Sequence, residues 1–361
     1  MKLLILGNGQ LGQMLAQSTI QLGHECLLIN TRINQVMPAG AHVALSLSIE
    51  DAMQWADVVS WEHEQLNPEH VALAAAKLLT DADKILPLTH RQLEKKLCDS
   101  LGIPTAPWQA FNTADEFQQA MQKWQQSVVI KAAFGGYDGK SQWRWAVGDD
   151  IDALIATAGH QPGIIEAMIP FTREVSVVGA RARDGRILCY PLVENVHRNG
   201  ILSHTFAGYE AVPEHLQNAA EAAFKAITEH LGYVGTLAIE FFVVGEGDNA
   251  QLLVNEIAPR VHNSGHWSLT GCNASQFDLH IRSLTNMPFP ELAIQPTLMV
   301  NAIGCEQIPT ELWQSPITSA FWYGKDSRPG RKVGHVNFRI ANRAEAERIS
   351  EHFTAALQVL S

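Results

Sequence analysis

The sequence lacks both a long apolar run and an excess of positive charge. Its 361 residues include 26 Lys and Arg against 37 Asp and Glu, which gives a formal net charge of −11. A nucleic-acid-binding surface needs a basic face, so no nucleic-acid partner is expected. No apolar run approaches the roughly 20 residues that span a bilayer, so no membrane association is expected either. The run 3–6 is too short for a signal peptide, and we expect a cytoplasmic protein.

The sequence also lacks the cysteine spacing of a metal site. Its five cysteines are Cys26, Cys98, Cys189, Cys272 and Cys305, and none forms a C-x-x-C pair. Free thiols in a reducing compartment are the expected state, with neither a zinc site nor a disulfide framework. At this length, with 46% hydrophobic and 17% charged residues, the chain can form two or three domains with sizeable cores.

The first hundred residues have the pattern of a parallel α/β domain. Strands are predicted at 2–6, 25–29, 42–47, 57–62 and 84–86, and a helix capped by Thr89 is predicted to stop at Gly102. The stretch 7–12, GNGQLG, matches the dinucleotide-binding pattern G-x-G-x-x-G. That pattern requires an acid after the next strand, where this chain has Asn30. We therefore favour a Rossmann-like domain whose glycine loop approaches a different ligand.

Two acids lie at the carboxyl end of the strand predicted at 57–62. Glu62 is its last residue and Glu64 follows it, at the edge where parallel α/β sheets bind ligands. The alternative is that both are solvated loop carboxylates.

A lysine and a glycine-rich loop follow in the second informative stretch, 128–141. The pattern predicts a strand that carries Lys131, a glycine loop, and a second strand at 142–145. Glycines allow backbone N–H groups to face phosphate oxygens, and a lysine on a strand supplies positive charge. The Walker A pattern is absent. Phosphate binding is favoured over a plain hairpin with a flexible tip.

Acidic residues end two neighbouring strand-like runs further along the chain. The runs 235–239 and 252–254 are followed by Glu240 and by Asn255-Glu256, and a glycine-rich turn at 245–249 separates them. A hairpin would bring Glu240 close to Glu256, and two such carboxylates repel unless a cation compensates. Mg²⁺ favours one or two carboxylates plus substrate phosphates, so a magnesium site is one interpretation of this pair. The other is that Glu240 ends an edge strand and points into water.

Three further features are ambiguous when taken alone. Glu174 and His197 would by themselves be read as surface or structural residues. The densest basic cluster, 325–332, is either an anion site in an acidic protein or a solvated turn.

Taken together, the motifs resemble the ATP-grasp superfamily and, within it, the N5-carboxyaminoimidazole ribonucleotide synthetase family. The matching segments, in order, are GNGQLG at 7–12, LGIPTAPW at 101–108, GGYDGKS at 135–141, REVSVVGAR at 173–181, NEIAPRVHNSGHW at 255–267 and RPGRKVGH at 328–335. The resemblance implies an α/β, ATP-grasp fold in three parts. These are an N-terminal Rossmann-like parallel-sheet domain at 1–103, a small α+β lid domain at 104–170 and a C-terminal α+β domain with a magnesium site at 171–361.

The resemblance also implies roles for individual residues. For ATP it implies contacts from Arg91, Lys131, Gly135, Gly136, Tyr137, Asp138, Gly139, Lys140, Ser141, Glu166, Ala167, Met168, Ile169, Glu174, His197, Asn255 and Glu256. For Mg²⁺ it implies Glu240 and Glu256. For the acceptor and bicarbonate it implies Gln10, Leu11, Glu62, Arg260, His262, Asn263, Lys325 and Arg331, of which Arg260, Lys325 and Arg331, together with Asp138, take part in catalysis.

The implied reaction is ATP-dependent carboxylation of 5-aminoimidazole ribonucleotide with bicarbonate, through carboxyphosphate, in purine biosynthesis. The resemblance further implies a homodimer. Alternatives are another ATP-grasp ligase, such as formate-dependent glycinamide ribonucleotide transformylase or a biotin-carboxylase-like enzyme, and a nucleotide-binding regulator without catalysis. The joint presence of Lys131, Glu240, Asn255 and Glu256 argues against the regulator. A nicotinamide dehydrogenase ranks third.

Overall fold

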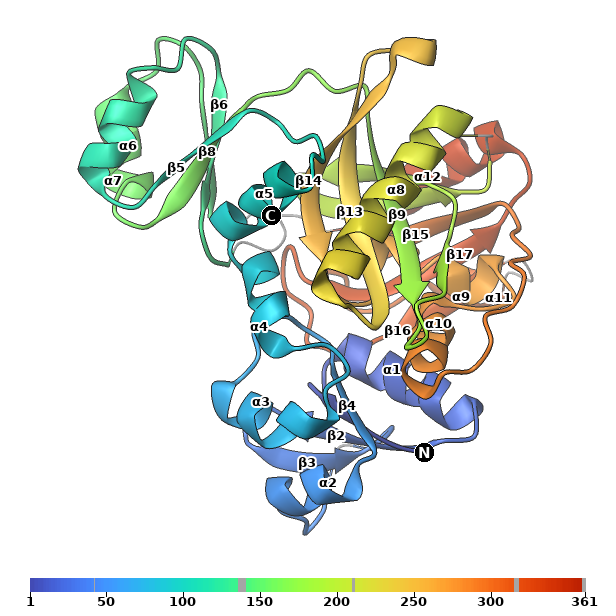
Figure 1. Cartoon of the computed structure of the whole chain (residues 1–361). Helices are drawn as coiled ribbons and strands as arrows, with labels where there is room; N and C mark the ends of the chain where they lie inside the picture. Colours follow the sequence, from blue (N-terminus) through green and yellow to red (C-terminus); the bar gives the residue numbers. More distant parts are fainter. Residues whose placement is uncertain (42, 136–140, 210–211, 315–317, 359–361) are drawn as a thin grey trace.

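Three β-sheets organise the chain. The computed structural model describes residues 1–41, 43–135, 141–209, 212–314 and 318–358. In Figure 1 the first sheet lies at the bottom, a small sheet with two helices projects at the upper left, and a large sheet fills the right. Over the described part of the chain, no helix is both long and apolar enough to cross a membrane.

The first sheet is a four-stranded sheet with the order β3-β2-β1-β4. Its strands are β1 (Lys2–Leu6), β2 (Glu25–Asn30), β3 (Gln35–Pro38) and β4 (Val58–Trp61), with helices α1 (Gln10–Gln21), α2 (Ile49–Trp55) and α3 (Pro68–Ala74). The strand β1 pairs in parallel with β2 and β4, as predicted. The strand β3 runs antiparallel to β2, so the prediction of a purely parallel sheet was wrong at this edge.

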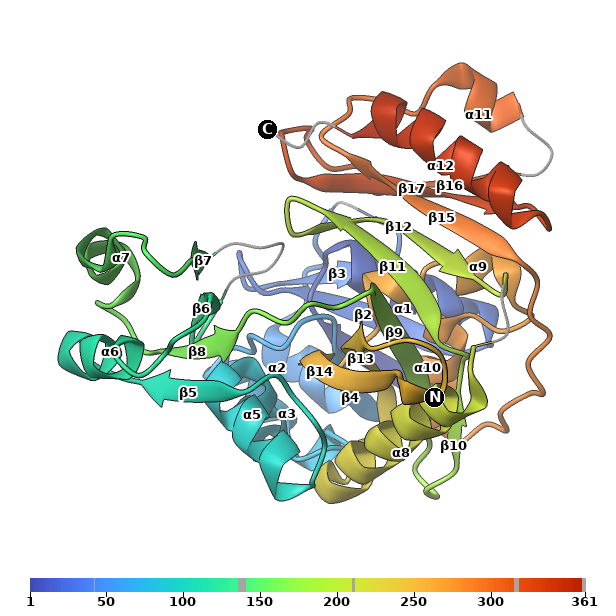
Figure 2. The same cartoon turned by 90° about the horizontal axis from the view of Figure 1, so that it is seen from above.

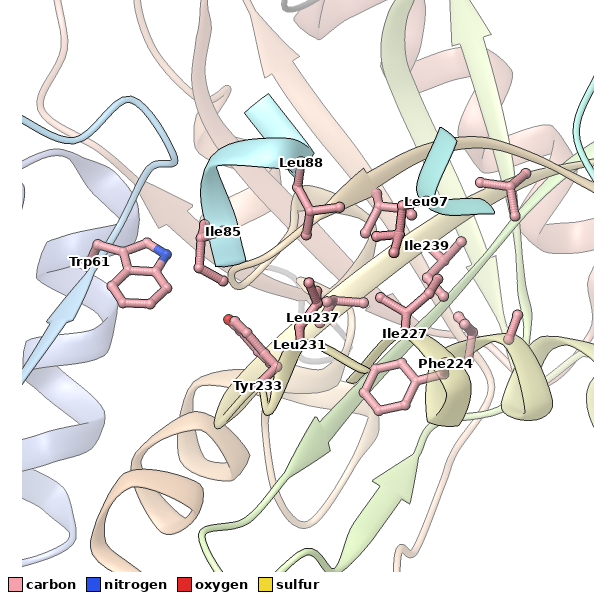
Figure 3. Packing of buried hydrophobic residues seen from close by; sticks show 14 of the residues in the cluster. Trp61, Ile85, Leu88, Leu97, Phe224, Ile227, Leu231, Tyr233, Leu237 and Ile239 are labelled. Carbon is pink, nitrogen blue, oxygen red and sulfur yellow. The ribbon is translucent and has the colours of Figure 1, made fainter. Parts of the chain in front are cut away.

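Two predicted strands of this region do not form over the residues that the structure describes. The third strand lies at 35–38 instead of 42–47, and the N–H of Leu45 donates to the carbonyl of Val36 from outside any strand. The run 84–86 instead joins helix α4 (Ala82–Ile85) to a 3-10 turn at Leu86–Thr89. Helical spacing turns Ile85 and Leu88 to the same core, which a short apolar run cannot reveal (Figure 3).

Helix α5 (Arg91–Ser100) follows this turn and leads to the small sheet. Its N-cap residue is His90, which makes no side-chain capping bond, so the predicted cap by Thr89 was wrong. The N–H of Arg91 instead donates to the carbonyl of Ala133, which attaches the start of the helix to the glycine-loop segment. The first turn of α5 is therefore positioned by tertiary contact.

The small sheet is antiparallel, with the order β5-β8-β6-β7. It comprises β5 (Trp108–Phe111), β6 (Val128–Ala132), β7 (Gln142–Trp145) and β8 (Gly163–Ala167), with helices α6 (Ala114–Met121) and α7 (Ile151–Ala158). Alternation along β6 buries Val128 and Ile130 in the core under these helices. Lys131 points to the opposite face, where the cavity lies.

The large sheet is antiparallel, and nine of its strands lie in the described residues. The strands are β9 (Arg173–Arg181), β10 (Ile187–Cys189), β11 (Val193–Arg198), β12 (Ile201–Ala207), β13 (Gly235–Val244), β14 (Gln251–Ala258), β15 (Thr297–Ile303), β16 (Thr318–Trp322) and β17 (Lys332–Arg339). The helices are α8 (Glu214–Leu231), α9 (Ser268–Gly271), α10 (Gln276–Thr285), α11 (Thr310–Gln314) and α12 (Arg343–Leu357). Figure 2 shows α11 and α12 beside β15–β17, away from the small sheet.

A shared hydrophobic core joins the first sheet to the large one. Figure 3 shows Trp61 at one end, Ile85 and Leu88 above, and residues of α8 and β13 opposite. The indole N–H of Trp61 and the hydroxyl of Tyr233 both donate to the carbonyl of Pro259, at 3.0 and 2.8 Å. The polar ends of both rings are therefore satisfied inside the core, and the two sheets are held at a defined distance.

Each sheet draws its strands from a separate stretch of chain: 2–61, 108–167 and 173–339. We propose that the domain limits follow this division, at 103/104 and 170/171.

Candidate active site

One cavity of about 1980 Å³ lies where the three sheets meet. It brings together nineteen of the predicted site residues: Gln10, Leu11, Glu62, Arg91, Lys131, Glu166, Ala167, Met168, Ile169, Glu174, His197, Glu240, Asn255, Glu256, Arg260, His262, Asn263, Lys325 and Arg331. Gly135 lines a small adjoining cavity instead, and Ser141 accepts a bond from the N–H of Ala132 through its carbonyl. The predicted residues Gly136, Tyr137, Asp138, Gly139 and Lys140 lie outside the described residues.

A β-bulge places the acidic cluster in this cavity. The strands β13 and β14 form the predicted hairpin, with Glu240 directly opposite Glu256. The register then shifts, because Phe241 pairs with Val254 and leaves Asn255 as an extra residue. Consecutive side chains of a regular strand point to opposite faces, whereas a bulge can turn neighbours to the same side. The bulge thus explains how both Asn255 and Glu256 line the cavity.

The acid pair has the electrostatics of a cation site. Burial raises the pKa of Glu240, and the carboxylates of Glu256 and Glu174 raise it further, against the opposing effect of His197. The ring Nε2 of His262 lies 3.6 Å from Glu240 Oε1, but burial and Arg260 hold the pKa of His262 well below its usual value. A neutral imidazole cannot compensate these carboxylates. The oxygens of Glu240, Glu256 and Asn255 therefore fit Mg²⁺, which combines few protein oxygens with substrate phosphates.

A buried carboxylate joins two lysines beside the acid pair. Glu166, on β8, lies with Oε2 at 2.7 Å from Lys131 Nζ and Oε1 at 2.8 Å from Lys95 Nζ. Lys131 also donates to Asn255 Oδ1 at 3.0 Å. Burial alone would raise the pKa of Glu166, but the two lysines outweigh it and lower the pKa to about 2. Glu166 is therefore a permanent anion, and Lys131 is held over the bulge.

Lys95 was not predicted as a site residue, because it belongs to a charged segment whose sequence is typical of a solvent-exposed helix. Helical spacing was the available signal, since Gln92, Lys95 and Cys98 are three residues apart and all three are buried. A lysine on the buried face of a helix needs a buried partner, which Glu166 supplies.

The backbone beside Lys131 is partly committed to other contacts. Arg91 Nη1 donates to the carbonyls of Ala132 and Gly135, both at 2.6 Å, so its guanidinium holds the start of the glycine loop. In the predicted adenine segment, the N–H of Ala167 donates to Pro107 and that of Met168 to Ser127. Both N–H groups are therefore already bonded within the protein.

The pair Glu174 and His197 joins β9 to β11 at the cavity wall. Glu174 Oε2 lies 2.9 Å from His197 Nδ1. Burial would lower the pKa of His197, but Glu174 and Glu240 outweigh it and raise the pKa above its usual value. Glu174, a predicted ATP contact, and Glu240, a predicted magnesium ligand, thus both favour the protonated form of His197.

The glycine loop encloses a carboxylate. Glu62 accepts hydrogen bonds from the N–H groups of Gly9 and Gly12, at 2.6 and 2.7 Å. A Cβ at Gly9 would lie 2.7 Å from Glu62 Oε1, so any larger residue there would displace this carboxylate. A side-chain anion thus occupies the start of α1, where a dinucleotide pyrophosphate would bind. This arrangement argues against a nicotinamide dehydrogenase, because Glu62 occupies the place where the cofactor's pyrophosphate would bind.

Glu64 connects the first sheet to the segment after β14. Its Oε2 lies 3.0 Å from Arg260 Nε, and both side chains are buried. The alternative that Glu62 and Glu64 are solvated loop carboxylates was therefore wrong. Asn263, three residues further on, exchanges amide hydrogen bonds with Asn301 on β15, which holds this segment against the large sheet.

The basic loop closes the opposite end of the cavity against the glycine loop. Lys325 Nζ donates to Gln10 Oε1 and lies 5.5 Å from the centre of the Tyr323 ring. Burial lowers the pKa of Lys325 to about 8, with Arg331 as the next contribution. Arg331 Nη1 donates to the carbonyl of Asp326 at 3.1 Å. Two basic residues from one loop thus line the cavity, and Lys325 contacts the start of α1, an arrangement that suits an anionic ligand.

Models of three protein families match consecutive parts of the chain: a ribonucleotide synthetase preATP-grasp domain at 1–93, an ATP-grasp domain at 96–277 and a phosphoribosylaminoimidazole carboxylase C-terminal domain at 297–349. N5-carboxyaminoimidazole ribonucleotide synthases from Vibrio vulnificus strain CMCP6 and Escherichia coli K12 are both 37% identical to it. The first match covers 93% of this chain and 90% of the relative, and the second 99% and 93%.

Solved structures agree with this relationship. The synthetase from Thermus thermophilus superposes with a TM-score of 0.84 and 32% identity, covering 99% of this chain and 98% of its own. The synthase from Aspergillus clavatus, solved with ADP and 5-aminoimidazole ribonucleotide, superposes with a TM-score of 0.82 and 27% identity, covering 98% of each chain. The chain has the ATP-grasp fold, and it belongs to the N5-carboxyaminoimidazole ribonucleotide synthase family.

Proposed function

We propose that the cavity between the three sheets is where this chain, an ATP-grasp carbon–nitrogen ligase, carboxylates 5-aminoimidazole ribonucleotide with bicarbonate. Family membership supplies the ATP-dependent carboxylation and its place in purine biosynthesis. The observation that carries the assignment of the site is the bulge at Asn255. It brings Asn255, which accepts a hydrogen bond from Lys131, and Glu256 into the cavity that the basic loop also lines.

The nucleotide end is assigned to the wall formed by the small sheet and β13–β14. Lys131 would contact the phosphates, and the pair Glu174 and His197 would lie against the nucleoside. Glu240, Glu256 and Asn255 would hold Mg²⁺, which supplies charge neutralisation at the phosphate oxygens when bound. The donor set supports this, since it combines three protein oxygen donors with a raised pKa on Glu240.

The acceptor end is assigned to the glycine loop and the basic loop. Glu62 and Gln10 would contact the acceptor, and Lys325 and Arg331 would bind its phosphate. Arg260, oriented by Glu64, would hold bicarbonate between the two ends together with His262 and Asn263. The neutral state of His262 suits this place, because it can accept as well as donate a hydrogen bond.

The chemistry follows from the weakness of bicarbonate as an electrophile. A bicarbonate oxygen attacks the γ-phosphorus, the bond to the β-phosphate oxygen breaks, and carboxyphosphate and ADP form. Lys131 offsets the charge that develops on the transferred group. The acceptor amine then attacks the carboxyl carbon and displaces phosphate, or it attacks carbon dioxide that carboxyphosphate has released together with phosphate. In both cases the amine loses a proton to give the carbamate. Enclosure by the three sheets would limit hydrolysis of carboxyphosphate.

The test is ADP release with ATP, Mg²⁺ and bicarbonate, measured with and without 5-aminoimidazole ribonucleotide. We expect strong stimulation by the acceptor, and we expect Glu256→Gln to abolish it. The matched control is Glu246→Gln, which changes an exposed glutamate in the turn between the same two strands and should leave the rate unchanged. Acceptor-independent ADP release, or a fully active Glu256→Gln variant, would refute the assignment.

The proposed setting is the cytoplasm, and the proposed assembly is a homodimer, as the family resemblance implies. Sedimentation would test the assembly directly. A monomer at working concentration would contradict it.

A further inference from the structure

We propose that Lys95 is a positioning residue for ATP, because it shares the Glu166 carboxylate with Lys131 and so leaves the Lys131 charge available to the nucleotide phosphates. The inference rests on the proposed function, in which Lys131 contacts phosphate. It concerns a residue behind the cavity wall, since the side chain of Lys95 is only 1% exposed.

The geometry gives Lys95 three partners from two elements. Its ammonium group lies 2.8 Å from Glu166 Oε1, and it donates to the carbonyls of Val254 and Asn255 at 3.2 and 3.3 Å. An ammonium has three donors, so this set of partners saturates it. One buried lysine therefore joins β8 of the small sheet to the bulge on β14.

Charge balance gives this link a function. Two lysines and one carboxylate leave one net positive charge on the trio of Lys95, Lys131 and Glu166. Without Lys95, Glu166 would neutralise Lys131 completely, in surroundings where both side chains are largely shielded from water. A phosphate would then have to compete with an internal carboxylate for Lys131. Lys95 thus weakens that competition, because it occupies the other oxygen of Glu166.

The bonds to Val254 and Asn255 add a geometric role. Asn255 is the extra residue of the bulge, and its carbonyl is fixed by Lys95 while its side chain accepts from Lys131. Both lysines therefore hold the same residue, Lys95 through its backbone carbonyl and Lys131 through its side-chain oxygen. Loss of Lys95 would loosen the segment that presents Asn255 and Glu256 to the cavity.

The experiment compares Lys95→Met with Lys96→Met. Lys96 is the next residue on α5 and is exposed, so the control removes the same charge outside the site. ADP affinity by calorimetry and the KM for ATP are measured for both. We expect Lys95→Met to weaken each by about 10- to 100-fold, the usual consequence of losing an interaction with a charged group, and Lys96→Met to change neither.

The double variant Lys95→Met with Glu166→Gln separates charge sharing from packing. It removes the carboxylate that would otherwise neutralise Lys131, so nucleotide affinity should recover most of the loss seen in Lys95→Met. A merely structural role predicts that the double variant is as weak as, or weaker than, the single one. Lys95→Gln, which keeps a donor toward Val254 and Asn255, replaces Lys95→Met if the latter does not fold.

Two outcomes overturn the inference: unchanged nucleotide affinity in Lys95→Met, or no recovery in the double variant. Failure of the proposed function looks different. In that case the wild-type chain itself would not bind ADP or would not release it in response to 5-aminoimidazole ribonucleotide.

Discussion

Glu94 offers a test of the buried charges that depends on stability alone. It lies on α5 with its side chain buried, and its Oε2 accepts a hydrogen bond from the N–H of Ile257 at 3.0 Å. Burial raises its pKa from 4.5 to about 8, Glu256 adds to the rise, and Lys95 opposes it. Glu94 is therefore predominantly protonated at neutral pH in the folded chain and ionised in the unfolded chain.

The sign and size of the pH effect follow from this difference. The unfolded state loses the Glu94 proton as pH rises through 4.5, whereas the folded state keeps it until about pH 8. The stabilising contribution present below pH 4.5 is therefore lost between these values as pH increases. At 1.36 kcal/mol per pKa unit, the total loss is on the order of 5 kcal/mol.

We expect Glu94→Gln to remove this loss. Its amide oxygen can accept the same bond from Ile257, and it carries no charge at any pH. Urea unfolding at pH 5, 6, 7 and 8, followed by tryptophan fluorescence, should show the variant gaining on the wild type by several kcal/mol across the range. The control Glu351→Gln alters an exposed glutamate on α12 and should track the wild type. Parallel profiles for Glu94→Gln and wild type would refute the reasoning.

Two further predictions concern the acceptor end. Because the pKa of Lys325 is about 8, this cation is lost above pH 8, and the KM for 5-aminoimidazole ribonucleotide should rise there. Steady-state kinetics should show a flatter rise in Lys325→Arg. An unchanged rise in that variant would mean that another group titrates. Gly12→Ala should destabilise the fold by about 1–3 kcal/mol, because the new Cβ would lie 2.6 Å from the backbone oxygen of Gly7. A thermal unfolding midpoint equal to that of the wild type would contradict this prediction.

The hairpin with the two acids shows what local pattern can predict. Strand-like runs, a glycine-rich turn and acids at the strand ends were enough to predict that a hairpin brings Glu240 close to Glu256, and the register, with the two residues paired, confirms it. The bulge at Asn255 could not be predicted in this way. It depends on backbone groups of β14 finding partners on α5, which lies about 160 residues earlier in the chain.

The failures have the same physical origin. The run 84–86 is equally apolar in a strand or a helix, and packing of Ile85 and Leu88 against the shared core decided for helix. Glu62 and Glu64 looked solvated because their partners, the N–H groups of the glycine loop and Arg260, come from other parts of the chain. Burial of a charge is a property of what packs over it.

The sequence by itself determined the class of protein, because turn glycines, strand periodicity and ordered motifs are local features that can be recognised from the order of residues alone. It also determined which side chains could carry phosphate, metal and acceptor chemistry. Only the tertiary structure decided how those charges are shared: Glu166 between two lysines, Glu62 inside the glycine loop, and Lys325 against Gln10. Electrostatic strength depends on distance and burial, and the fold sets both by bringing distant segments together.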